Sequence, residues 1–219
     1  MRLAVFDCDG TLVDGQADIC SSMETAFAGA GLEAPERHAI RRIVGLSLPQ
    51  AVTMLAPDAD EEQRAAAVHG YKRAYRSARE EGRLHEPLFD GIAELLARLA
   101  VDGWTLAVAT GKSDRGLAAC LAHHGLVDAF ASLQTADRHP SKPHPAMLEA
   151  ALYETGAAAH EAVMIGDTSF DMAMARAANV TALGVSWGYH DRDELREAGA
   201  ADIVDTPDEL GARLQALPA

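Results

Sequence analysis

The chain has 219 residues, a formal net charge of -14 and a hydrophobic content of 48%. The acidic charge argues against a nucleic acid partner, because phosphate backbones attract basic surfaces. No apolar stretch approaches the ~18 residues that a membrane span requires and nothing at the N-terminus resembles a signal peptide, so we expect a cytoplasmic protein with no membrane partner.

The first predicted element is a buried strand that ends in two carboxylates. Residues 3–6 are consecutive apolar residues, which is typical of a central strand covered on both faces. Asp7 and Asp9 follow at its carboxyl end, where parallel sheets bind ligands, and Gly10 lets the backbone turn close to a ligand. Because two acids this close repel each other, we expect a cation, with Mg²⁺ as first choice. The alternative is that Asp9 or Thr11 only caps a following helix.

The segment after this strand is predicted to be helical. Apolar residues recur at helical spacing from Gln16, and Gly31 ends that first helix. Further helices are expected over residues 36–44, 47–56 and from 60 onward. Because no convincing strand interrupts residues 15–87, we expect a helical insert there.

After residue 87 strands and helices alternate. Buried strands are expected over residues 104–109, 162–165 and 181–185, with weaker strands over 130–133 and 202–204. Helices are expected over residues 90–100, around 117–121, and over 146–155, 170–178 and 207–217. Repeated units of this length imply right-handed crossovers, so the predicted class is α/β with a parallel sheet between two helical layers.

Reactive side chains also follow two of the later strands. Thr110 and Gly111 come after one strand and supply a hydroxyl and backbone N–H groups, which together form an anion cradle. Asp167 and Asp171 span a strand-to-helix junction, near enough to approach one metal, although helix capping is the alternative for acids placed there. Lys142 lies in a proline-restrained loop, which fixes its positive charge. If the strands share a sheet, these groups converge with the first two acids on one cleft.

The order and the places of these groups resemble the haloacid dehalogenase superfamily phosphatases. The signature stretches occur in sequence as Asp7-Cys-Asp-Gly-Thr11, Thr110, Lys142 ahead of Pro143, and Gly166-Asp167 with Asp171. The stretches ATGKS, SKPHPAML and MIGDTSFDM are most similar to phosphoglycolate phosphatase-like proteins. The resemblance implies a Rossmann-like core domain, residues 1–14 and 88–219, and an all-α cap domain, residues 15–87, inserted after the first strand.

The resemblance also implies a role for each group. Asp7 is expected to be the nucleophile that forms an aspartyl-phosphate, and Asp9 the general acid and base. Thr110 and Lys142 complete the expected catalytic set. The expected Mg²⁺ ligands are the Asp7 carboxylate, the Asp9 backbone carbonyl, Asp167 and Asp171. The expected phosphate-binding residues are Gly10, Thr110, Gly111 and Lys142.

The alcohol part of the substrate is less closely defined. In related enzymes a cap loop contacts it, and residues 44–48 are the counterpart here. Arg42, Gly45 and Ser47 are therefore the candidate specificity residues, with Arg42 as a partner for a carboxylate; Arg42 and Ser47 are also ordinary helix-end residues. The expected partner is a small phosphorylated metabolite, with phosphoglycolate as first choice, and the expected assembly is a monomer or homodimer.

Two other functions fit parts of the pattern. A phosphomutase similar to β-phosphoglucomutase would use the same stretches but pass the phosphoryl group to a sugar phosphate instead of to water. A non-enzymatic phospho-acceptor signalling module also gathers acids, Thr and Lys around Mg²⁺. That module lacks an acid two residues after the acceptor and leaves the helical insert unexplained.

Overall fold

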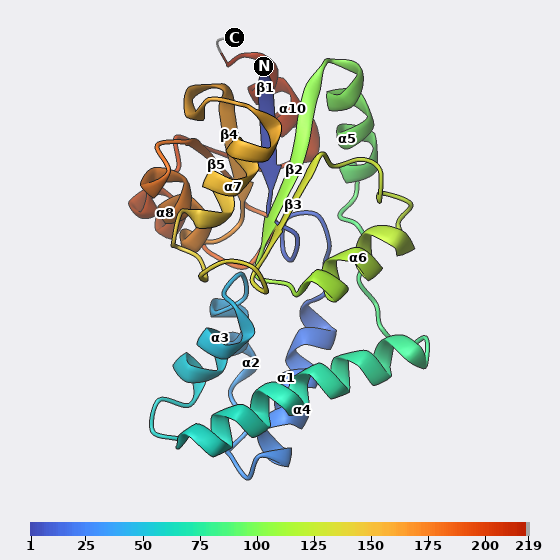
Figure 1. Ribbon diagram of the computed structural model, residues 1–219, viewed down its shortest axis with the longest axis vertical. Coiled ribbons are helices and arrows are strands. Elements are labelled where there is room, and N and C mark those ends of the chain that lie inside the picture. The colour runs from blue at the N-terminus through green and yellow to red at the C-terminus, as the bar shows by residue number, and fades with distance from the viewer. Residues whose placement is uncertain (218–219) are drawn as a thin grey trace.

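A parallel six-stranded sheet forms the centre of the molecule in the computed structural model, which describes residues 1–217. The strand order is β3-β2-β1-β4-β5-β6, so the first strand of the chain is central (Figure 1). The strands are β1 (Arg2–Phe6), β2 (Trp104–Thr110), β3 (Ser132–Thr135), β4 (Ala162–Gly166), β5 (Thr181–Val185) and β6 (Asp202–Val204). This arrangement confirms the predicted fold class.

Helices cover both faces of the sheet because successive side chains of a strand point to opposite faces. Ala4 and Phe6 of β1 face the layer of α5, α6 and α10, whereas Leu3 and Val5 face the layer of α7, α8 and α9. The first layer is α5 (Ile92–Val101), α6 (Asp114–His123) and α10 (Pro207–Gln215). The second layer is α7 (Ala146–Thr155), α8 (Ser169–Ala177) and α9 (Arg192–Ala198).

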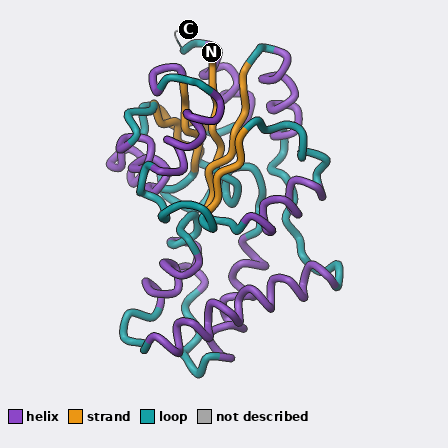
Figure 2. The backbone as a smooth tube through the Cα atoms, in the orientation of Figure 1, coloured by secondary structure: helices purple, strands orange, loops and turns teal. Residues whose placement is uncertain are grey.

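Four helices lie beyond one end of the sheet, and we call them the helical unit (Figure 2). They are α1 (Gln16–Gly29), α2 (Arg37–Arg42), α3 (Leu48–Leu55) and α4 (Glu61–Glu80). The helical unit has its own apolar cluster, which includes Met23, Phe27 and Ile40. A capping box of Asp60 and Gln63 begins α4, as expected where a long exposed helix starts.

The two connections between the sheet and the helical unit run side by side. Val13 and Leu88 form an isolated antiparallel bridge. The Asp14 amide donates to the Pro87 carbonyl (2.9 Å), and the Phe89 amide donates to the Leu12 carbonyl (3.0 Å). The chain therefore leaves and re-enters the sheet region at one place.

Some predicted elements differ from the observed ones. β3 begins two residues later than expected, because the buried polar side chains of Ser132 and Gln134 hide the strand pattern; both donate to Glu154 (2.7 Å each). α9 was not predicted, because only Leu195 among its seven residues is buried and no apolar period marks it. The last helix ends at Gln215. Among the described helices, none has the length and apolar character needed to cross a bilayer.

Candidate active site

The candidate site lies where three neighbouring strands end. Asp7 follows β1, Thr110 is the last residue of β2, and Asp167 follows β4. Because β1 pairs with β2 on one side and β4 on the other, in parallel, all three carboxyl ends share one edge. The convergence predicted from the sequence is therefore present in the structure.

Asp7 is fully buried, and its two carboxylate oxygens differ in their partners. Oδ1 accepts hydrogen bonds from the Cys8 amide (2.6 Å) and lies 2.8 Å from Lys142 Nζ. Oδ2 is buried and has no hydrogen-bond partner among residues 1–217. Burial raises the pKa of Asp7 to about 7, and this increase is opposed by Lys142 and reinforced by Asp171. One oxygen of this carboxylate is thus held in place while the other is left without a protein donor.

Asp167 and Asp171 are also fully buried, and each is fixed by protein donors. Asp167 accepts from the Thr11 hydroxyl (2.8 Å) and the Tyr189 amide (2.9 Å). Asp171 accepts from Lys142 Nζ (2.6 Å) and from the Thr168 hydroxyl (2.7 Å) and amide (3.1 Å). The last contact is part of a helix capping box, so Asp171 both caps α8 and belongs to the acidic cluster.

The cluster of Asp7, Asp167 and Asp171 fits a hard divalent cation. Ligand oxygens of the three carboxylates lie within 4.8 Å of one another. Burial raises the pKa of Asp167, and the negative charges of Asp7 and Asp171 add to this increase. Three carboxylates and Lys142 together carry a formal charge of -2, and oxygen donors of this kind bind Mg²⁺ and similar ions. The unpartnered Oδ2 of Asp7 is the atom that such an ion would satisfy.

The other predicted anion-binding residues differ in where they lie. Lys142 has no exposed surface and sits between Asp7 and Asp171. Thr110 is buried and its hydroxyl accepts from the Lys112 amide (3.2 Å). Gly111 lines the cavity described below. The Gly10 amide donates to the Val13 carbonyl (2.9 Å), and the expectation that Gly10 binds phosphate stays a prediction.

The absence of a side chain at Gly10 also leaves the space that the Asp167 carboxylate occupies. It has a φ of +86°, and a Cβ atom there would overlap both the Asp167 carboxylate and the Tyr189 ring. Glycine is therefore required at this position by backbone conformation and by the close approach of Asp167.

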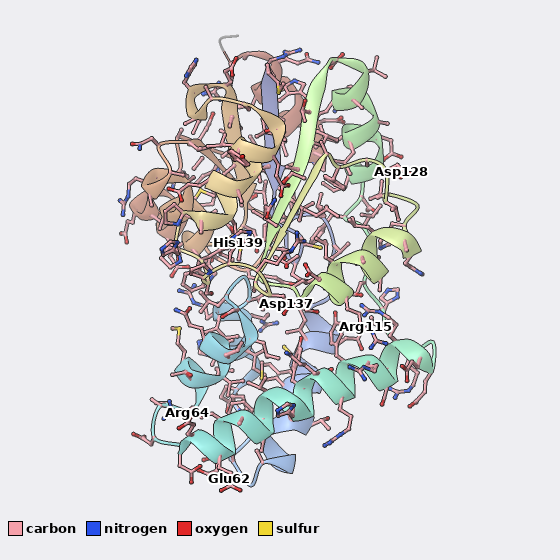
Figure 3. All side chains as sticks on the ribbon, in the orientation of Figure 1. Glu62, Arg64, Arg115, Asp128, Asp137 and His139 are labelled. Atoms are coloured by element: carbon pink, nitrogen blue, oxygen red, sulfur yellow. The ribbon has the colours of Figure 1, made fainter. Side chains whose placement is uncertain are left out.

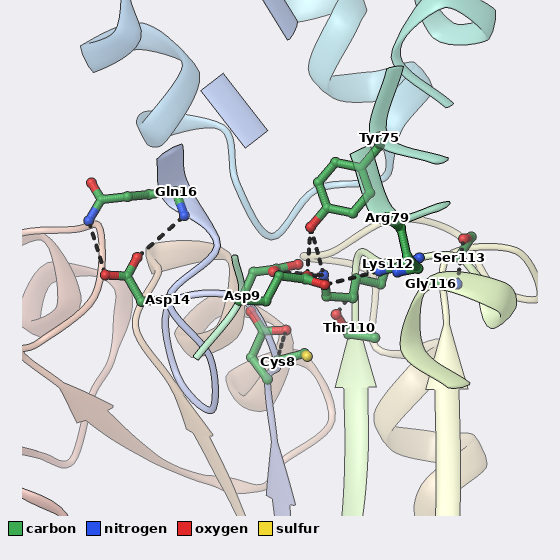
Figure 4. A network of polar contacts seen from close by, with 12 residues as sticks. Cys8, Asp9, Asp14, Gln16, Tyr75, Arg79, Thr110, Lys112, Ser113 and Gly116 are labelled. Carbon is green, nitrogen blue, oxygen red and sulfur yellow. Dashed lines mark hydrogen bonds and ion pairs between the residues drawn. The ribbon is translucent and has the colours of Figure 1, made fainter. Parts of the chain in front are cut away.

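Asp9 belongs to a second, separate group of charges (Figure 4). Its Oδ1 lies 2.9 Å from Lys112 Nζ, and Lys112 Nζ also lies 2.6 Å from Glu86 Oε1. Burial raises the pKa of Asp9, and the charge of Lys112 opposes this increase. Burial also disfavours the charged form of Lys112, but Asp9 and its other neighbours outweigh it and raise the pKa of Lys112. No sequence motif links Lys112 with Glu86, because the two residues meet only in the folded chain.

A cavity of about 510 Å³ separates this edge of the sheet from the helical unit. Gly45 and Ser47 line it, as expected for the loop of residues 44–48. A Cβ atom on Gly45 would lie 3.8 Å from Asp7 Oδ2, and the Ser47 amide donates to the Ser141 hydroxyl (2.7 Å). On the other side of the cavity, Arg115 points from α6 toward α4 and lies 3.8 Å from Glu80 (Figure 3).

The expectation that Arg42 meets a carboxylate of the substrate stays a prediction. Arg42 does not line the cavity; its guanidinium forms an ion pair with Glu194 of α9. The Ser169 amide donates to His190 Nδ1 (3.2 Å), so His190 Nε2 is the protonated nitrogen and donates to the Arg42 carbonyl (3.1 Å). Arg42 therefore connects the helical unit to the second helical layer.

Comparisons with known proteins agree over nearly the whole chain. A family model described as haloacid dehalogenase-like hydrolase matches residues 4–185. A probable phosphatase, IndB, of Dickeya dadantii is 40% identical, with 98% of this chain and 94% of the relative covered. A phosphoglycolate phosphatase of Mesorhizobium japonicum is 29% identical, with 97% and 94% covered. The crystal structure of a predicted phosphatase from Clostridium acetobutylicum superposes with a TM-score of 0.88 at 28% identity, covering 99% of each chain.

Proposed function

The chain belongs to the haloacid dehalogenase-like hydrolase family and is a phosphatase within it, and on that premise we propose that it hydrolyses a small phosphate monoester through an aspartyl-phosphate. The observation that carries this proposal is the environment of Asp7. One oxygen is anchored by Lys142, and the other is buried without a donor beside Asp167 and Asp171. A carboxylate held in this way is positioned to act as a nucleophile.

The first chemical step is attack of an Asp7 oxygen on phosphorus. The bond between phosphorus and the ester oxygen breaks, and Asp9 gives its proton to the departing alkoxide. In the second step Asp9 takes a proton from a water molecule, which attacks the aspartyl-phosphate and releases inorganic phosphate. Asp9 lies two residues beyond Asp7 and belongs to a different group of charges, which suits a separate role in proton transfer.

The phosphoryl oxygens are held by the residues at the end of β2 and by Lys142 in this mechanism. Thr110 supplies a hydroxyl, Gly111 a backbone amide, and Lys142 a fixed positive charge. Asp7, the Asp9 carbonyl and Asp167 would hold a Mg²⁺ ion, which would supply positive charge beside the phosphoryl group. Asp171 lies in the same acidic cluster and would support the ion directly or through water.

We also propose that the helical unit is a cap. In this division residues 15–87 form the cap domain, and residues 1–14 and 88–219 form the core domain. The paired connections at Val13 and Leu88 support a boundary at this place. Gly45 and Ser47 then meet the alcohol part of the substrate in the cavity.

Phosphoglycolate is the leading substrate, supported by the likeness to a relative named phosphoglycolate phosphatase. A cavity of about 510 Å³ also has room for larger monoesters such as sugar phosphates. The test is a panel of phosphate monoesters assayed with Mg²⁺ and ranked by kcat/KM. We expect phosphoglycolate to rank first. Release of inorganic phosphate without added sugar bisphosphate supports a hydrolase, whereas a bisphosphate requirement would identify a phosphomutase.

A further inference from the structure

A buried lysine joins the proposed general acid to a second carboxylate. Lys112 is 7% exposed at its side chain and lies between Asp9 Oδ1 (2.9 Å) and Glu86 Oε1 (2.6 Å). Figure 4 shows Lys112 reaching toward Asp9 from the turn after β2. Lys112 contacts both carboxyl groups at once from a buried position, so the contact with Glu86 fixes the place of the ammonium group beside Asp9.

Glu86 is in turn fixed by α4 of the helical unit. The Tyr75 hydroxyl donates to Glu86 Oε1 (2.6 Å), and Arg79 donates to Glu86 Oε2 (3.0 Å). The backbone carbonyl of Glu86 lies 2.8 Å from His124 Nε2, at the end of α6. Glu86 therefore lies between the helical unit and the sheet region: its carboxylate contacts α4 on one side and Lys112 on the other, and its carbonyl contacts His124.

The first connection to the helical unit reaches the same place. A Cβ atom on Gly15 would lie 3.5 Å from Asp9 Oδ1 and 3.6 Å from the Glu86 side chain. Glu86, on the second connection, therefore lies close to Gly15 of the first connection and contacts Lys112, which in turn contacts Asp9. A shift of α4 relative to the sheet must move Glu86 and, through Lys112, change the surroundings of Asp9.

We propose that Lys112 is a positioning residue for Asp9, and that Glu86, held by Tyr75 and Arg79, transmits the position of α4 to it. The proposal rests on the proposed function, because it assigns Asp9 the proton transfer to the leaving group. Asp9 delivers its proton to the ester oxygen only when its carboxyl group is held at the cavity. Lys112 holds it there when α4 lies against Glu86.

The competing explanation is that Lys112 binds the substrate directly, since it also lines the cavity. The two roles differ in how they depend on the leaving group. A lysine that binds the phosphoryl group contributes equally to all phosphate monoesters. A lysine that positions the general acid matters for an alkoxide, which needs a proton to leave, and little for p-nitrophenolate, which does not.

The experiment compares Lys112→Met with the unaltered protein on phosphoglycolate, ribose 5-phosphate and p-nitrophenyl phosphate. The measured quantity is kcat/KM, which reports the phosphorylation step whichever step limits turnover. We expect kcat/KM for the alkyl esters to fall at least ~10-fold more than for p-nitrophenyl phosphate. Lys112→Arg, which keeps the charge, should recover part of this difference. Tyr75→Phe should give the same selective loss on a smaller scale, about threefold.

Matched controls and contrary results follow from the same design. Arg83→Met removes an exposed cation whose ion-pair partner is Glu81, and it should leave all three values unchanged. Thermal unfolding of each variant checks that the fold persists.

An equal loss on all three esters would overturn the positioning role, while the proposed function would stand. No hydrolysis of any ester by the unaltered protein would overturn the proposed function itself. A selective loss in Lys112→Met but none in Tyr75→Phe or Glu86→Gln would overturn the link to α4.

Discussion

A Cβ atom on Gly111 would lie 2.6 Å from the carbonyl oxygen of Gly45. The turn after β2 therefore contacts the loop that begins α3, with no room for a side chain between them. The size of residue 111 therefore controls how closely the loop before α3 can approach the end of β2.

Gly111→Ala should keep the loop at residue 45 away from the phosphate site. We expect kcat/KM to fall at least ~10-fold and the free energy of unfolding to change by no more than about 2 kcal/mol, since the helical unit can move aside. Steady-state kinetics and urea unfolding measure the two quantities. Gly29→Ala is the control, because a Cβ atom there meets nothing within 4 Å. Full activity in Gly111→Ala would show that the closed contact is not needed for turnover.

Asp7→Asn should abolish turnover while the protein stays folded. The amide is nearly the same size as the carboxylate but cannot form the aspartyl-phosphate, so we expect a loss of at least ~10³-fold in kcat. Phosphate release is the assay, and far-UV circular dichroism checks the fold. Asp128→Asn changes an exposed aspartate on the same domain and serves as the control. Retained turnover in Asp7→Asn would rule out Asp7 as nucleophile.

Mg²⁺ should stabilise the protein against unfolding, and a chelator should remove activity reversibly. Asp7, Asp167 and Asp171 repel one another in the folded state, and an ion bound only to that state raises its stability by about 2.7 kcal/mol at a hundredfold excess over Kd. Thermal unfolding with Mg²⁺ or with EDTA measures the shift. Asp167→Asn should reduce the shift strongly, and Asp193→Asn, at an exposed ion pair, should not. An undiminished shift in Asp167→Asn would place the ion elsewhere.

The ion pair of Arg42 and Glu194 should make stability depend on pH in the acid range. The hydrogen bond from Arg42 lowers the pKa of Glu194 from 4.5 to about 2. Since the folded pKa is depressed, the stabilisation is complete above pH 4.5 and is lost as the pH falls toward 2. The pair is partly exposed, so we expect at most about 1 kcal/mol. Urea unfolding of the unaltered protein and of Glu194→Gln should differ at pH 7 and converge at low pH; a constant difference would contradict this.

The acidic cluster could be predicted because strand ends obey a simple rule. Asp7 and Asp167 each follow a run of buried apolar residues, and parallel strands place such residues at one edge of the sheet. The position of a residue that depends only on the preceding strand can be predicted from the sequence. Thr110 is a further example, since it closes β2.

Contacts between distant segments could not be predicted in the same way. The sequence made Arg42 a candidate partner for a carboxylate of the substrate. Its ion-pair partner, Glu194, lies on a helix whose apolar pattern is too weak to recognise. Lys112 and Glu86 are separated by α5 and β2, and no local pattern marks a pair of opposite charges that becomes buried on folding. The residues at the carboxyl ends of the strands could therefore be predicted from the sequence. The contacts that fix the helical unit could not, because they join segments that are far apart in the chain.

The side-by-side arrangement at Val13 and Leu88 has a consequence for modularity. Paired backbones at such a bridge are about 5 Å apart, a gap that a two-residue turn spans. The segment between Val13 and Leu88 contributes no strand to the sheet, so the hydrogen bonding of the sheet does not depend on it. The length of this insert can therefore change without breaking any rung of the strand ladder.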